Sequence, residues 1–164
     1  MRQHSSFEDE LSALLPRMRR FAHALSRNSA DADDLTQMTI ERALKSRTQW
    51  QPGTRLDSWA YTIMRNLWID TVRSRSRRDK VEAPEEEARS AGHDPRDAIE
   101  ASVDLARMMA AMEQLPGEQR EVVALILIEG FGYRETAEML GLPIGTVSSR
   151  LVRGRTALLD MVGA

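Results

Sequence analysis

An acidic segment divides this chain of 164 residues into two parts. The segment runs from Val81 to Pro95, VEAPEEEARSAGHDP, and contains two prolines, one glycine and few large apolar side chains. It cannot bury enough apolar surface to fold by itself, and its Pro and Gly residues interrupt regular structure. The sequence therefore predicts two small domains, residues 5–79 and 96–162, joined by a flexible acidic linker over residues 80–95.

Both predicted domains have the apolar spacing of helices. Apolar side chains recur three and four positions apart, and no sustained alternation typical of a strand appears. Helix starts are expected at Ser5, where Glu8 would complete a capping box, and at Asp31, Thr54, Asp94 and Gly117. Pro16 should interrupt the first helix, and the helix before Pro116 should stop there. We therefore expect an all-α fold.

Composition excludes several classes of protein. Apolar residues make up 41% of the chain and charged residues 29%, which suits a folded helical protein better than a disordered chain. No apolar run is long enough for a membrane span, and the start, MRQHSSFEDE, lacks the apolar core of a signal peptide. With no Cys and three scattered His, neither a disulfide nor a metal site is expected, and no cofactor motif is present. These features predict a cytoplasmic protein without membrane insertion.

Charge is segregated along the chain, although the net charge is only −2. Residues 1–80 hold 15 basic and 10 acidic side chains, whereas residues 81–100 hold 2 basic and 7 acidic ones. Basic groups that neutralise phosphates dominate nucleic-acid affinity. The first half of the chain therefore has the charge of a nucleic-acid-binding protein, and the linker does not.

The stretch from Tyr133 to Leu159 has the spacing of a helix-turn-helix. A small residue (Ala137), a turn glycine (Gly141) and an apolar pair (Val147 and Leu151) would let two helices cross closely. The outward positions of the second helix are Thr146, Ser148, Ser149, Val152 and Arg153. Such a face fits the major groove of DNA. The alternative is an ordinary helical hairpin with a solvated polar face.

The segment from Leu115 to Leu159 resembles region 4 of the extracytoplasmic-function (ECF) sigma factors, in its LPxxxRxV start and its GTVxSRLxRxRxxL end. The resemblance implies that the second helix enters the major groove of the −35 promoter element. Ser148, Ser149, Val152 and Arg153 would then face bases, with Thr146 beside them. Arg120, Arg134 and Arg150 would contact phosphates.

A second resemblance lies in the first domain. The stretch DADDLTQMTIERAL, Asp31 to Leu44, is similar to sigma region 2.2, which docks on the clamp helices of the largest polymerase subunit. The residues that this similarity assigns to docking are Asp34, Leu35, Gln37, Met38 and Glu41, of which Asp34 and Gln37 are the strongest candidates. The alternative is an amphipathic helix with an acidic first turn.

Aromatic and basic residues follow between Thr48 and Arg78. Aromatic rings that stack on bases and cations that hold the backbone are what unpaired nucleic acid requires. The stretch resembles sigma regions 2.3 and 2.4, which implies −10 element contacts by Trp50, Arg55, Leu56, Arg65, Asn66, Arg73, Arg75, Arg77 and Arg78. Trp68 is assigned instead to packing, and Trp59 is open between packing and function because it shares a four-residue stripe with Ile63 and Leu67.

Taken together, the resemblances imply an ECF sigma factor that responds to stress, directs transcription initiation and catalyses no reaction itself. The implied partners are core RNA polymerase (its clamp helices and its flap), double-stranded and melted promoter DNA, and an anti-sigma factor. Two other functions are the alternatives. A dimeric helix-turn-helix repressor leaves the QPGTRLDSW loop without a role, and a helical enzyme lacks any triad, phosphate-loop or metal spacing.

Overall fold

The computed structural model describes residues 5–80 and 103–163 of the chain. Within these ranges the regular structure is helical throughout, with no strand, so the predicted all-α fold is confirmed. The N-terminal half contains α1 (Phe7–Ala13), α2 (Leu15–Ser26), α3 (Ser29–Lys45), the short η1 (Arg47–Gln49) and α4 (Leu56–Asp79). The expected linker, apart from its first residue, and the expected helix cap at Asp94 lie outside the described residues.

Local signals explain where the first helices begin. The capping box of α1 is formed by Ser6 and Asp9: the Asp9 N–H donates to Ser6 Oγ (3.1 Å) and the Ser6 N–H donates to Asp9 Oδ2 (3.4 Å). The expected box at Ser5 and Glu8 was wrong by one residue, since the carboxylate that reaches back belongs to Asp9. Pro16 lies in the first turn of α2 and separates it from α1, as expected.

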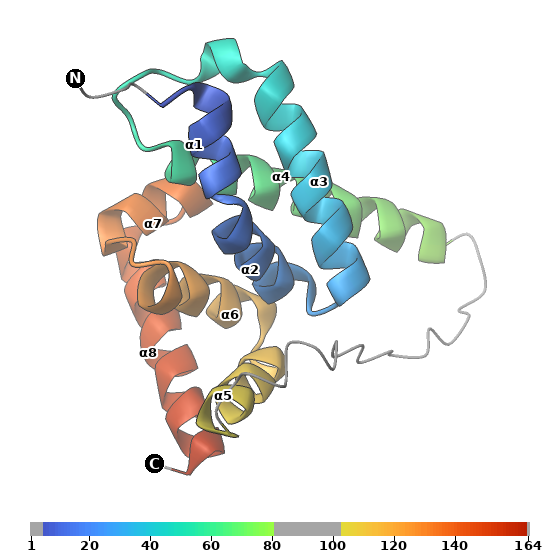
Figure 1. Ribbon diagram of the computed structural model, residues 1–164. Coiled ribbons are helices and arrows are strands. Elements are labelled where there is room, and N and C mark those ends of the chain that lie inside the picture. The colour runs from blue at the N-terminus through green and yellow to red at the C-terminus, as the bar shows by residue number, and fades with distance from the viewer. Residues whose placement is uncertain (1–4, 81–102, 164) are drawn as a thin grey trace.

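The core of the N-terminal half lies between α2, α3 and α4. Met18 and Phe21 of α2 are fully buried against Leu35 of α3 and Tyr61 of α4. The Phe21 and Tyr61 rings stack with their centroids 4.9 Å apart. Because α4 continues well past this core, its last turns project beyond the other helices (Figure 1).

The C-terminal half contains α5 (Val103–Gln114), α6 (Gly117–Val123), the π-helical turn η2 (Ala124–Ile128), α7 (Tyr133–Leu140) and α8 (Ile144–Val162). The helix before Pro116 ends at Gln114, as expected, and α6 continues into η2 up to Ile128. The buried side of α8, which includes Val147, Leu151 and Gly154, packs on α6, and Gly154 lies at the close approach of the two helices. The two halves lie against each other, with α2 and α4 facing α6 and α7 (Figure 1).

Candidate nucleic-acid interface

Helices α7 and α8 form the predicted helix-turn-helix. Gly141 ends α7 in the left-handed region, with φ of 65°, where a side chain would be strained. The Leu142 N–H donates to the Ala137 carbonyl (3.0 Å) and closes the turn before Pro143 starts the next helix. Ala137, Val147 and Leu151 are buried between the two helices. The spacing in the sequence therefore predicts the orientation of α8 correctly.

The outer face of α8 is open to solvent. Ser149 and Arg153 are exposed, and Val152 has 60% of its surface exposed. Arg153 Nε donates to the Ser149 carbonyl (3.3 Å), which lays the guanidinium along the helix. Thr146 and Ser148 are partly buried beside this face. On the neighbouring helix α7, Arg134 is exposed.

Two of the expected phosphate contacts are placed differently. Arg120 is only 6% exposed, and its guanidinium donates to the carbonyls of Leu115 (2.7 Å), Leu25 (3.4 Å) and Ala24. Burial lowers the pKa of Arg120 to about 10. In this arrangement the expectation that Arg120 contacts phosphate is therefore wrong. Arg150 is partly buried and lies 3.6 Å from a Glu118 carboxylate oxygen.

The C-terminal half of α4 forms a second exposed basic surface. Asn66, Arg73, Arg77 and Arg78 are exposed there, as a nucleic-acid contact requires. Arg75 is also exposed, but it forms a bidentate pair with Asp31 of α3 (2.7 and 2.9 Å), and its guanidinium lies over the Trp68 ring. Trp68 is partly buried against the core, which confirms its assignment to packing.

The loop before α4 is tied to the protein interior. Trp50, expected to hold a base, is half-buried against the Phe7 ring at 5.6 Å, with its indole N–H buried. Trp59 meets the same Phe7 ring edge-on at 6.1 Å, so in this structure it serves packing. Leu56 is buried in the core, and the expectation that it contacts DNA is wrong here, because the first turn of α4 directs it inward.

The exposed side of α3 carries the expected polymerase-docking residues, with one exception. Asp34, Gln37, Met38 and Glu41 are exposed and share one stripe of the helix, with Met38 42% exposed. Leu35 is 2% exposed and faces the core, so its docking assignment is wrong. The stripe continues to Leu44, which is also exposed and which the sequence reading missed. Leu44 lies three residues after Glu41, and this helical spacing could have placed it on the same stripe.

The two halves meet at a polar seam around one carboxylate, Glu129 at the end of η2. Its side chain is 1% exposed and accepts three hydrogen bonds from the N-terminal half. The donors are Arg17 Nε (3.0 Å), Arg20 Nε (2.9 Å) and the Tyr61 hydroxyl (3.0 Å). Burial and the neighbouring Glu129 charge raise the pKa of Tyr61 well above its usual range. The sequence contains no local signal for this cluster.

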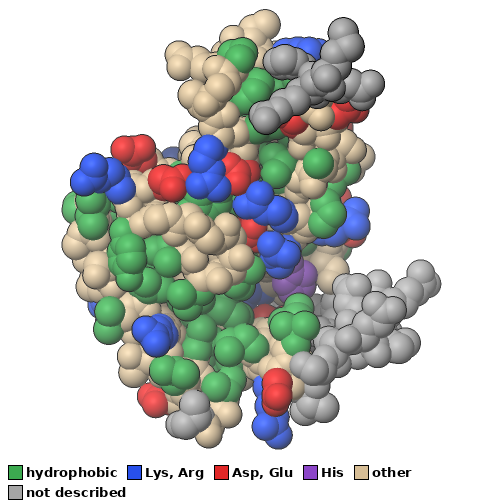
Figure 2. Space-filling view, turned by 60° about the vertical axis from the view of Figure 1, so that its left-hand side comes forward, with side chains coloured by type: hydrophobic (Ala, Val, Ile, Leu, Met, Phe, Trp, Pro, Cys, Tyr) green, Lys and Arg blue, Asp and Glu red, His purple; other side chains and the backbone are tan. Residues whose placement is uncertain are grey.

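Two expected −10 contacts also lie in the seam. Arg65 pairs with Glu121 of α6. Arg55 donates to Glu135 of α7 (2.8 Å), and its guanidinium lies over the buried Phe131 ring (4.5 Å). Figure 2 shows basic and acidic side chains interleaved in a band across this face, above a broad area of hydrophobic side chains. In this arrangement Arg55 and Arg65 bind carboxylates of the other half.

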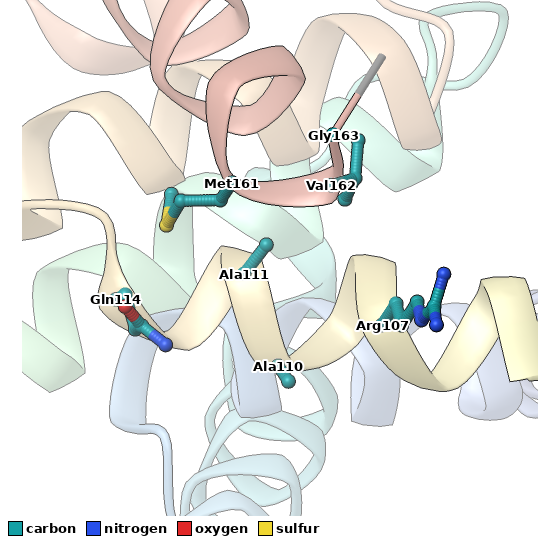
Figure 3. A pocket seen from close by; sticks show the side chains of 7 residues that line it. All are labelled: Arg107, Ala110, Ala111, Gln114, Met161, Val162 and Gly163. Carbon is teal, nitrogen blue, oxygen red and sulfur yellow. The ribbon is translucent and has the colours of Figure 1, made fainter.

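A shallow groove of about 310 Å³ lies between α5 and the end of α8 (Figure 3). Among the described residues that line it, Arg107 is the one ionisable side chain. General acid–base or nucleophilic chemistry needs converging reactive groups, so this groove offers no support for an enzyme. In the described ranges, no cluster of His, Asp or Glu is placed to hold a metal ion. None of the helices there combines the length and apolar run that crossing a membrane requires.

Comparison with known proteins assigns both halves. Residues 11–78 match the model of Sigma-70 region 2, and residues 105–158 match that of Sigma-70 region 4. The chain is 38% identical to ECF RNA polymerase sigma factor EcfG of Rhodopseudomonas palustris, over 97% of this chain and 88% of that protein. It is 42% identical to ECF RNA polymerase sigma factor SigE of Mycolicibacterium smegmatis, over 88% of this chain but only 56% of SigE.

A solved structure agrees with these matches. The sigma factor RpoE of Bartonella quintana, crystallised in complex with the anti-sigma factor NepR, superposes with a TM-score of 0.80 at 30% identity. The match covers 96% of this chain and 97% of RpoE. The helices of this chain thus have the arrangement of a known sigma factor over almost their whole length. The chain belongs to the sigma-70 family of RNA polymerase sigma factors, in its extracytoplasmic-function group.

Proposed function

We propose that this sigma factor brings core RNA polymerase to promoters by holding two DNA elements at once. Residues 5–79 bind the polymerase and the −10 element, residues 96–162 bind the −35 element, and residues 80–95 link them. The observation that carries the proposal is the presence of two separate exposed basic surfaces on one chain, the outer face of α8 and the end of α4. Catalysis is left to the polymerase, and we expect the protein in the cytoplasm with it.

We assign the contact with the −35 promoter element to α8. Ser149, Val152 and Arg153 project from successive turns on one side of the helix, and a helix with such a face fits a major groove roughly 12 Å wide. Small hydroxyl side chains allow the helix to approach the base edges, while Arg153 offers a fork of donors to guanine. Arg134 on α7 is placed at the flank, where a phosphate contact would fix the register.

The −10 contact falls to α4 and the loop before it. Asn66 is the exposed side chain best suited to a base edge, because its amide both donates and accepts. Arg73, Arg77 and Arg78 follow on the projecting end of the helix and would track the phosphate backbone. Trp50 can stack on a flipped base only after it leaves Phe7, so base capture requires the loop to rearrange.

The exposed stripe of α3 is the surface we assign to the clamp helices of the polymerase. It combines the carboxylates of Asp34 and Glu41 with the amide of Gln37 and the apolar surface of Met38. Such a mixture suits a specific but reversible contact, in which apolar area supplies affinity and charge supplies orientation. The C-terminal half is expected to meet the polymerase flap.

An anti-sigma factor is the regulator we propose. RpoE of Bartonella quintana was crystallised with one, and the present chain shares its fold at 30% identity. The C-terminal half also leaves large apolar side chains uncovered, including Leu127, Ile128 and Tyr133, which a helical partner could bury. A pull-down from uninduced cells should recover such an inhibitor in a complex free of core polymerase. Recovery of core polymerase alone, in every growth state, would contradict this regulation.

The promoter assignment is tested on Arg153. In the holoenzyme, Arg153→Ala should weaken promoter binding by about 1–3 kcal/mol and relax sequence preference in the −35 element, since a base contact is lost. Arg150→Ala, a matched loss of one Arg from the same helix, should weaken binding equally for all −35 sequences. Footprints and affinities on a set of −35 variants measure both effects. If Arg153→Ala changes neither the promoter affinity nor the sequence preference in the −35 element, the assignment of base contacts to α8 is wrong.

A further inference from the structure

Three side chains that the sequence assigns to DNA form contacts between the two halves. Arg55 and Arg65 of the N-terminal half pair with Glu135 and Glu121 of the C-terminal half. In the opposite direction, Arg120 donates to the carbonyls of Leu25 and Ala24 at the end of α2. The C-terminal half therefore holds Arg55 and Arg65, which the N-terminal half would offer to DNA, and Arg120 ties the halves together from the other side.

Glu129 is the contact on which the seam depends most. The Glu129 side chain is 1% exposed, so its carboxylate has lost its hydrating water. The free-energy cost of this loss is large unless hydrogen-bond donors of the protein replace the water. All three of its donor side chains, on Arg17, Arg20 and Tyr61, come from the N-terminal half. If the halves separate, Arg17 keeps its hydrogen bond to Asp57 of its own half, whereas Glu129 loses all three donors and must be hydrated again. The Glu129 carboxylate is therefore paired in the closed form and hydrated in the open form.

We propose that this seam is a latch that holds the free sigma factor closed, with Glu129 as its central contact and Arg55 and Arg65 as the DNA-binding groups that it withholds. This inference rests on the function proposed above and adds its regulation. When the halves separate, promoter phosphates offer Arg55 and Arg65 the same charge-assisted hydrogen bonds that Glu135 and Glu121 provide in the closed form.

The polymerase-docking stripe lies outside the latch. Asp34, Gln37, Met38 and Glu41 remain exposed on α3 while the seam is closed. Core polymerase can therefore bind the closed sigma factor before any promoter contact, and opening follows on the enzyme. This order favours promoter binding by the holoenzyme, because the closed free chain keeps Arg55 and Arg65 paired with carboxylates of the C-terminal half.

The first test measures the distance between the halves in the free protein. The chain has no Cys, so Ser12→Cys on α1 and Thr156→Cys on α8, both exposed positions, accept one dye each without background labelling. Energy transfer should be high in this parent. It should fall in Glu129→Gln, because the amide N–H group then faces the Arg donors in place of a carboxylate oxygen.

Two further variants keep this test decisive. Glu138→Gln, an exposed site on α7, removes the same charge from the same half and should leave energy transfer unchanged. Arg20→Ala removes one Glu129 donor from a half-exposed side chain, so it weakens the latch without touching either core. Circular dichroism confirms that each variant is folded. Low energy transfer in the parent, or parental values in both Glu129→Gln and Arg20→Ala, would overturn the latch.

The second test measures promoter-duplex binding without polymerase. Glu129→Gln should bind about tenfold more tightly than Glu138→Gln, since the competent open form becomes the major one. If Glu129→Gln opens the chain but leaves DNA affinity unchanged, the seam does not withhold DNA contacts and the inference fails. The proposed function is judged separately, by the effect of Arg153→Ala in the holoenzyme.

Discussion

Gly154 should resist replacement by alanine although it lies in the middle of a helix. At this point α8 crosses α6 so closely that a Cβ on Gly154 would lie 2.8 Å from Val123 Cγ2 and 3.3 Å from Gln119 Cβ. Val123 is buried and β-branched, so its side chain has little freedom to turn away. Gly154→Ala must therefore push α8 away from α6.

Two opposing effects decide the size of the change. Replacing a helical glycine by alanine stabilises the helix by about 1 kcal/mol, whereas an added methyl group in a packed core costs about 1–3 kcal/mol. We expect Gly154→Ala to lower the free energy of unfolding by about 1 kcal/mol. The matched control is Gly145→Ala in the first turn of α8, where no atom lies within 4 Å of the added Cβ. That change should raise stability by up to about 1 kcal/mol.

Urea denaturation of the full chain, followed by far-ultraviolet circular dichroism, measures both values. The double variant Val123→Ala with Gly154→Ala should lose less stability than the two single changes predict together, because the smaller side chain makes room for the new methyl group. If Gly154→Ala stabilises the protein as much as Gly145→Ala does, the close approach of α6 and α8 does not limit this position.

Two further predictions concern the N-terminal half. The Arg75 hydrogen bonds lower the pKa of Asp31 below its usual 3.8, so the stability they add is full above that value and is lost as pH falls through the lowered pKa. With Arg75 half-exposed, Asp31→Asn should lower stability at pH 7 by less than about 1 kcal/mol. Urea titrations should show this difference shrinking as the pH falls below 3.8, and a difference that stays constant would contradict the predicted direction. Asp34→Ala with Gln37→Ala should reduce competition for core polymerase while helix content is retained, and parental competition by this double variant would contradict the docking assignment.

Much of the fold follows from signals carried by neighbouring residues. Pro16 separates α1 from α2, Gly141 ends α7, and the spacing of Val147 and Leu151 places the buried side of α8. Each signal acts within one or two helical turns, so the sequence alone reveals it. The register of the first cap failed by one residue because Ser5 and Ser6 are each followed by a carboxylate three residues later, so the spacing fits either one.

The candidate site was predicted less completely, for two physical reasons. Leu35 and Leu56 were assigned to partners although both are buried, because an apolar side chain looks the same whether it packs on the core or on another protein. The contacts that Arg65 and Arg120 make with the other half were not predicted, because the sequence shows their charge but not their partners. Those partners lie 56 and 96 positions away along the chain, where no local pattern can indicate them.

The composition of the seam suits a contact that must be broken by DNA. An apolar interface of the same extent would gain nothing from phosphates, since the phosphate backbone offers no apolar surface to replace the one it displaces. Arginine side chains paired with carboxylates are different, because a phosphate presents the same charge and similar oxygen spacing to the guanidinium. Arg55 and Arg65 can thus exchange one anion for another without being left unpaired and buried, which lowers the cost of opening at the site where DNA arrives. The Glu129 cluster has no such substitute on the DNA side, so it sets the stability of the closed form, and the outer pairs set how easily a promoter opens it.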